Sequence, residues 1–316
     1  IVDTSIFFEA PLDGYTCEGE TYGLPQEFNL EYGAVLVSED MFTAAGLDYP
    51  PAWGTWDDVI ADAAALSQIG DDGQMTVTGY HFTNADAITF AFLAGILQRG
   101  GSYWNADQTA FTFDTPEALA TIEQMKAMVD AGVIDPVLFN DSANWGGDAF
   151  FTNQAASVLI GPWAVAYGLG DFPDFGNFDY VALPSFGDTP DFAADSGWGL
   201  TVSQNSAHAD VAWDFIQFAT ANADNALGWN NTSGTIPALK ELVENDEYKS
   251  QLLEAQPWLE QVLPLLQYGH YIGDMPDRDL VFYDIVYPYI LDYLQGLSSA
   301  EETLAYIEED ANASFD

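Results

Sequence analysis

The chain has 316 residues, 48% of them hydrophobic and 15% aromatic, and its 50 Asp and Glu against 5 Lys and Arg give a net charge of −45. This length predicts two domains, or one domain with a large insertion, and the aromatic content argues against a disordered chain. Because phosphates need a basic footprint, the charge disfavours nucleic acids, anionic membranes and strongly anionic substrates as partners. The acidic surface suits work at high salt or outside the cell.

The sequence carries no sign of a membrane span or an internal disulfide. No apolar run reaches the roughly 18 residues that a transmembrane helix needs. Cys17 has no second cysteine within the chain, so we expect a buried free thiol or a partner outside these residues. The chain opens at Ile1 without a signal peptide, which is typical of a processed or partial chain.

Hydrophobic patterning predicts strands and longer helices in alternation, which places the chain in the α/β class. Helices are expected where capping residues precede apolar residues at helical spacing. The predicted strands cover 32–37, 75–82, 156–160, 178–183 and 199–202. The predicted helices cover 38–46, 55–66, 87–97, 115–132, 206–218, 237–243, 247–253, 277–294 and 299–311.

A single aromatic residue in the middle of the chain is the first candidate for ligand binding. The apolar run 156–160 breaks at Gly161 and Pro162, and Trp163 follows at once. Pro162 holds the turn and Gly161 leaves it uncrowded, which would present the indole at a strand end. A rigid aromatic face suits stacking on the apolar C–H face of a sugar ring. Packing in the core is the alternative role for Trp163.

No catalytic or metal motif stands out. The chain lacks the Gly-x-Ser-x-Gly nucleophile turn, the phosphate-binding loop and the dinucleotide fingerprint. His81, His208 and His270 lie far apart and lack metal-ligand spacing. We therefore predict no catalytic residue, no cofactor and no metal. With fifty carboxylates no single pair is marked for glycoside hydrolysis, so that reading stays open.

Ordered motifs across residues 22–237 resemble one family, the extracellular solute-binding proteins of carbohydrate ABC importers that include maltose-binding protein. The motifs are Tyr22-Gly-Leu-Pro25, 40–51 with Thr55-Trp-Asp-Asp58, Gly100-Gly101, 113–118, 129–132, 151–156 with Gly161-Pro162-Trp163, 196–200, 212–218 and Gly234-Thr-Ile-Pro237. Val37-Ser-Glu-Asp40 departs from the family pattern. The family has roughly a hundred residues before the first motif, about one small domain, so the chain is expected to lack the N-terminal part of the first lobe.

The resemblance implies a type II periplasmic-binding-protein-like fold, with two α/β lobes, a hinge and a ligand cleft between the lobes. Residues 1–28 and 204–272 would be the remainder of the first lobe, and 33–198 with 277–316 the second. The hinge crossings would be 29–32, 199–203 and 273–276. Closure around the ligand would signal occupancy to a membrane permease.

The resemblance also implies which residues touch the ligand. Trp163 corresponds to the sugar-stacking aromatic residue. Glu31, Trp198 and Tyr283 fall near ligand-contacting positions, and Gly197 would offer a backbone N–H to a sugar hydroxyl.

Three further residues are candidate hydroxyl partners by chemistry alone. They are Glu27, Asn29 and Asn230, for each of which a solvated surface side chain is the alternative. Core packing is the alternative for Trp198, at a strand start, and for Tyr283, on an aromatic-rich helix.

The sequence therefore predicts a non-enzymatic receptor, extracellular, surface-held by a lipid anchor or periplasmic. It would capture a neutral sugar or oligosaccharide and deliver it to the permease subunits of an ABC importer. Two alternatives remain: a carbohydrate-active hydrolase with an Asp/Glu pair, one carboxyl of which is kept neutral by burial, and a non-transport acidic surface protein.

Overall fold

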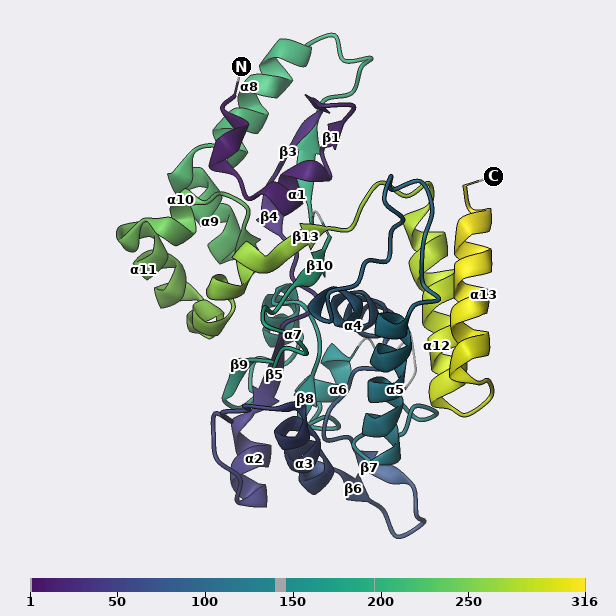
Figure 1. The fold of residues 1–316 in the computed structure, drawn as a ribbon. Helices are drawn as coiled ribbons and strands as arrows, with labels where there is room; N and C mark the ends of the chain where they lie inside the picture. The colour runs from purple at the N-terminus through teal and green to yellow at the C-terminus, as the bar shows by residue number, and fades with distance from the viewer. Residues whose placement is uncertain (1, 140–145, 196, 316) are drawn as a thin grey trace. The chain divides into compact units, whose positions relative to one another are not determined.

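A computed structural model describes residues 2–139, 146–195 and 197–315 and divides the chain into two compact units (Figure 1). Unit 1 comprises 1–31, 161–170 and 193–273, and unit 2 comprises 32–160, 171–192 and 274–316. Ser196, part of the 196–200 motif, lies outside the described residues.

Unit 2 is built on a three-stranded antiparallel sheet. Its central strand β5 (Ala34–Ser38) pairs on one side with β8 (Ser157–Val158) and on the other with β9 (Phe178–Ala182). Every residue of β5 is buried, because apolar layers cover both faces of the sheet. Single parallel bridges from Thr78 to Ala155 and from His81 to Val158 extend the sheet beyond β8.

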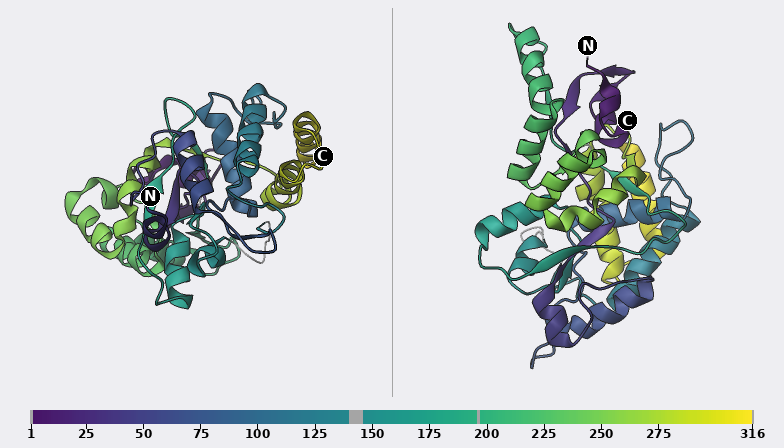
Figure 2. Two further views of the ribbon diagram at one scale, coloured as in Figure 1. Left: turned by 90° about the horizontal axis from the view of Figure 1, so that it is seen from below. Right: turned by 90° about the vertical axis from the view of Figure 1, so that its left-hand side faces the viewer.

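Helices surround this sheet, and several begin at the caps that the sequence predicts. Ser38, Thr55, Thr115 and Ser299 each accept a backbone N–H at a helix start, and Thr55 and Ser299 complete capping boxes. In Figures 1 and 2, α12 and α13 run side by side. The remaining elements of unit 2 are α2 (Glu39–Ala45), α3 (Trp56–Leu66), β6 (Gln68–Ile69), β7 (Met75–Val77), α4 (Ala85–Gln98), α5 (Pro116–Asp130), α6 (Gly147–Phe151), the π-helix η4 (Leu280–Val286), α12 (Tyr287–Leu294) and α13 (Ala300–Ala313).

Unit 1 joins short antiparallel ladders to a group of helices. β3 (Gly23–Pro25) pairs with β11 (Gly199–Thr201), and β4 (Glu27–Phe28) pairs with β12 (Ile236–Pro237). The other elements are η1 (Thr4–Ile6), α1 (Glu9–Asp13), β1 (Thr16–Cys17), β2 (Glu20–Thr21), α7 (Trp163–Asp171), β10 (Phe192–Ala194), α8 (Ala209–Thr220), α9 (Ala223–Ser233), α10 (Glu241–Glu244), α11 (Asp246–Ala255), η2 (Pro257–Gln261), η3 (Leu263–Tyr268) and β13 (Gly269–Tyr271).

Some predicted elements differ from the observed ones. Trp163 does not end a strand but begins α7, because the N–H groups of Ala164 and Val165 bond back to Gly161 and Pro162. The predicted strand over 75–82 forms only as β7 (Met75–Val77). The helix expected from Ser206 begins at Ala209, and Pro237 lies in β12 instead of opening a helix.

The compact units also differ from the predicted lobes. Segments 161–170 and 193–198, which the family resemblance places in the second lobe, group with unit 1 by their contacts. Bonds to the N-terminal segment accompany this grouping: the Trp198 carbonyl accepts the Gln26 N–H at 2.9 Å, and Glu31 accepts the N–H of Gly161 at 3.0 Å. The lobe boundaries and the hinge crossings at 29–32, 199–203 and 273–276 stay predictions.

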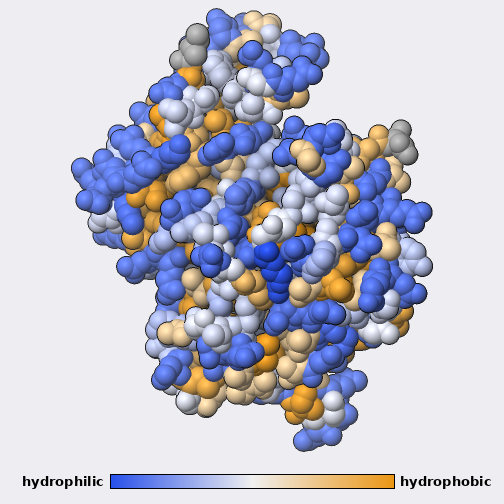
Figure 3. Space-filling model, in the orientation of Figure 1, coloured by the Kyte–Doolittle hydropathy of each residue, from blue (hydrophilic) through white to orange (hydrophobic). Residues whose placement is uncertain are grey.

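The surface is as polar as the composition requires. Hydrophilic side chains cover most of the face drawn in Figure 3. Cys17 is exposed in β1, which corrects the expectation of a buried thiol. No helix within the described residues combines the length and apolarity of a bilayer span.

Unit 2 contains a buried histidine, His81, which should make the folded protein less stable in acid. His81 is 0% exposed, and burial lowers the pKa of its imidazole to about 4 from 6.5. Between these two pH values the imidazole is neutral in the folded protein and protonated in the unfolded chain. The free energy of unfolding therefore falls by about 3 kcal/mol as the pH drops from about 6.5 to about 4.

We expect His81→Gln to flatten this part of the pH profile of chemical denaturation. His208→Gln, at an exposed position, is the matched control; equal slopes for both variants would contradict the assignment.

Candidate functional site

The Trp163 side chain of unit 1 is held by a carboxylate. One oxygen of Glu31 accepts the Trp163 indole N–H at 2.8 Å, and the other accepts the backbone N–H of Gly161 at 3.0 Å. Glu31 is 5% exposed. Both N–H groups thus have an acceptor at a buried side chain, and this pair of bonds fixes the direction of the indole at the start of α7.

Gly161 makes room for that arrangement. A Cβ atom at this position would stand 2.4 Å from the indole nitrogen of Trp163 and 2.9 Å from the Glu31 carboxylate. Such distances are far inside van der Waals contact. Glycine is therefore required at position 161 for space and not for an unusual backbone angle.

A small hollow with a volume of about 10 Å³ adjoins the indole within unit 1. This volume is about what one water molecule needs, so a sugar ring would lie over the hollow and not inside it. The residues that line it are Glu27, Phe28, Asn29, Pro162, Trp163, Thr235 and Ile236. An indole, a carboxyl group, an amide and a hydroxyl thus line one hollow.

Glu27 brings a buried carboxylate to this hollow. The side chain is 6% exposed, and burial raises the pKa of its carboxyl, while the N–H of Trp198 and the hydroxyl of Thr235 oppose the rise. The Trp198 N–H lies 3.2 Å from Oε1 of Glu27. Gly197 packs on the same side chain: with φ at +68°, a Cβ there would meet Cγ of Glu27 at 3.0 Å.

Trp198 and Asn29 lie where a ligand can reach them. Trp198 is 77% exposed, which rules out the core packing considered from the sequence. At this exposure the Trp198 indole is open to solvent. Asn29 is half-buried at the edge of the hollow.

Asn230 requires a correction. It is neither solvated nor facing the hollow but 0% exposed. Its amide donates to Thr235 Oγ1 at 3.0 Å and to the Gln26 carbonyl at 3.3 Å. Asn230 therefore supports Thr235, a lining residue that we did not single out although the Gly234-Thr-Ile-Pro237 motif contains it.

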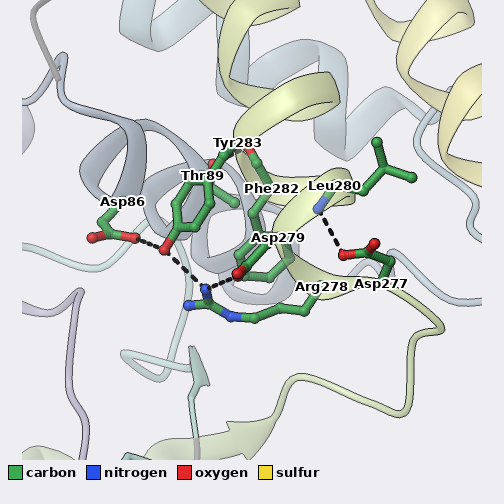
Figure 4. A network of polar contacts seen from close by, with 8 residues as sticks. All are labelled: Asp86, Thr89, Asp277, Arg278, Asp279, Leu280, Phe282 and Tyr283. Atoms are coloured by element: carbon green, nitrogen blue, oxygen red, sulfur yellow. Dashed lines mark hydrogen bonds and ion pairs between the residues drawn. The ribbon is translucent and has the colours of Figure 1, made fainter.

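Tyr283 belongs to unit 2, in a polar network shown in Figure 4. Its hydroxyl donates to Asp86 Oδ1 at 2.8 Å and accepts from Nη1 of Arg278 at 2.8 Å. Burial and the Asp86 charge raise the pKa of this phenol, while Arg278 opposes the rise. Arg278 also donates to Asp279 at 2.9 Å.

Both oxygen atoms of the Glu31 side chain are occupied. Both oxygens of Glu31 accept bonds from Gly161 and Trp163, an arrangement that orients a ring and leaves Glu31 poorly placed as a nucleophile or base. Within the described ranges, no three His, Cys, Asp or Glu side chains gather as a metal site would require.

Sequence comparison gives matches of one kind. The family described as "Bacterial extracellular solute-binding protein" matches residues 1–226. A lactose-binding protein of Rhizobium radiobacter is 26% identical over 219 residues, which are 68% of this chain and 49% of that protein. The match thus spans about half the length of this relative.

Solved structures show the same fold. An ABC substrate-binding protein of Listeria monocytogenes in complex with cycloalternan superposes with a TM-score of 0.79 at 25% identity, over 99% of this chain and 76% of that one. The cyclic α-maltosyl-1,6-maltose binding protein of Arthrobacter globiformis gives a TM-score of 0.77 at 22% identity, over 100% and 78% of the two chains. The fold is therefore the type II periplasmic-binding-protein fold, in the α/β class predicted from the sequence.

Proposed function

Because this chain belongs to the family of bacterial extracellular solute-binding proteins, we propose that it captures a neutral sugar or oligosaccharide and delivers it to the permease of an ABC importer. The proposed site of action is outside the membrane, in the periplasm or at the cell surface. The lactose-binding relative and the cycloalternan complex support a carbohydrate as the ligand class.

One observation carries this proposal: the Trp163 indole, held by Glu31, faces a hollow with a carboxylate, an amide and a hydroxyl. A sugar ring stacks its C–H face on such an indole, and its hydroxyls bond to the polar groups around it. We assign hydroxyl binding to Glu27, Asn29 and Thr235.

The other residues predicted from the sequence are proposed either to contact the ligand or to position a contacting residue. Trp198 offers a second stacking face, and Gly197 contributes the backbone N–H proposed from the family resemblance. Glu31 acts as a positioning residue for Trp163. Tyr283 is proposed as a ligand contact that unit 2 supplies.

A thermal-shift screen tests the function. Glucose, galactose, mannose, maltose, lactose and cellobiose are added to the chain, and the sugars are analysed by chromatography afterwards. A ligand at a hundredfold excess over its Kd stabilises the folded state by about 2.7 kcal/mol, a shift of several degrees in Tm. We expect at least one sugar to give this shift and to be recovered intact. No shift with any sugar would contradict the receptor function, and release of smaller sugars would favour a hydrolase.

A further inference from the structure

The charge inside the proposed sugar hollow is unbalanced. Of the side chains that line it, Glu27 is the charged one, and none is basic. Unit 1 has two lysines among its residues. Lys240 is committed elsewhere, since its ammonium donates to the Ser5 carbonyl at 3.0 Å, and Lys249 lies on α11. No ion pair between described residues includes Glu27.

The existing partners of Glu27 compensate for its charge only in part. One backbone N–H, from Trp198, and one hydroxyl, from Thr235, reach the carboxylate. A neutral sugar over Glu27 would remove it further from water and offer it hydroxyl donors. A cationic donor would also neutralise the Glu27 charge. This gain is largest where water is excluded, because a buried charge without a counter-charge is costly there.

The neighbouring indole is suited to the same kind of ligand. Trp163 lines the hollow together with Glu27, and tryptophan is the aromatic side chain that attracts cations most strongly. Because Glu31 fixes the indole N–H, the ring cannot turn away without breaking that 2.8 Å bond.

We propose that the site around this hollow binds a sugar unit with a protonated amine more tightly than a neutral sugar; this inference rests on the proposed function. Glu27 binds the ammonium group and Trp163 packs on the ring. Neutral sugars bind more weakly at the same place, and sugar acids bind weakest because their carboxylate meets that of Glu27. Glu27 is thus the residue that determines specificity for ligand charge.

Isothermal titration calorimetry tests this preference with one hexose in four forms. The hexose that gives the largest thermal shift is compared with its 2-amino, N-acetylated 2-amino and uronate counterparts at pH 7. We expect the amino sugar to bind at least about tenfold tighter than the neutral hexose. The N-acetylated form, which has no charge, should behave like a neutral sugar, and the uronate should bind weakest.

Two variants assign the preference to one residue. Glu27→Gln should bring the Kd of the amino sugar to within about threefold of the neutral hexose. Glu244→Gln removes the same charge at an exposed position of α10 and should keep the preference. Because affinities are compared within one variant, a change in its stability does not imitate the result.

The outcomes separate this inference from the proposed function. Equal binding of the amino and neutral forms by the unmodified protein, or a preference that survives Glu27→Gln, would overturn the inference and leave the sugar receptor intact. Binding of neither the amino nor any neutral sugar would overturn both.

Discussion

Gly161→Ala is expected to lower sugar affinity by at least about tenfold and to destabilise unit 1 by about 1–3 kcal/mol. The new methyl group would lie 2.4 Å from the indole nitrogen of Trp163. The ring must therefore move, and its bond to Glu31 breaks. Calorimetric titration measures the affinity, and near-UV circular dichroism of the ligand-free protein reports the displaced indole.

Gly170→Ala is the matched control for this substitution. Gly170 lies on the same helix, α7, and a Cβ there meets no atom within 4 Å. Alanine in a helix is favoured over glycine by about 1 kcal/mol, so this variant should be as stable as the parent or more so, with unchanged affinity. If both variants bind alike, the steric role of Gly161 is wrong.

Glu31→Gln is expected to weaken sugar binding about tenfold and to cost about 1–3 kcal/mol of stability. The carboxylate accepts two N–H groups, whereas a glutamine amide has one oxygen and would turn its NH₂ toward the second donor. Glu31→Ala leaves both donors without acceptors and should have the larger effect. Urea denaturation and calorimetric titration measure the two losses.

A double-mutant cycle tests whether Glu31 works through Trp163. Trp163→Phe keeps an aromatic ring but removes the indole N–H. If Glu31 positions the indole, Glu31→Gln should cost less in the Trp163→Phe background than in the parent, with an interaction energy of about 0.5–3 kcal/mol. Strictly additive effects would instead indicate that Glu31 contacts the sugar directly.

Local signals in the sequence predicted most helices of the fold correctly. Ser38, Thr55, Thr115 and Ser299 cap helices because each bonds to a backbone N–H within three residues. Such bonds depend on neighbouring residues alone. Reliance on local signals also explains one wrong prediction. Gly161 and Pro162 indicated correctly that the strand ends after residue 160, but they did not indicate that helix α7 begins at Trp163.

The candidate site depends on contacts between distant parts of the sequence, and here prediction reached less far. Trp163 stood out by its motif, yet its bond to Glu31 spans 132 positions. Asn230 was expected at the surface because asparagine is usually solvated. Its burial follows from bonds to Gln26 and Thr235, and the sequence gives no sign of the first of these.

The most direct test of the account is a calorimetric titration of Trp163→Ala with the sugar that stabilises the parent protein most. Loss of a central stacking residue typically costs about 2 kcal/mol or more, so the Kd should rise by roughly thirtyfold. Trp229→Ala, at a partly exposed position of α9 outside the hollow, should bind as the parent does. Equal affinity of Trp163→Ala and the parent would contradict the claim that this indole holds the sugar.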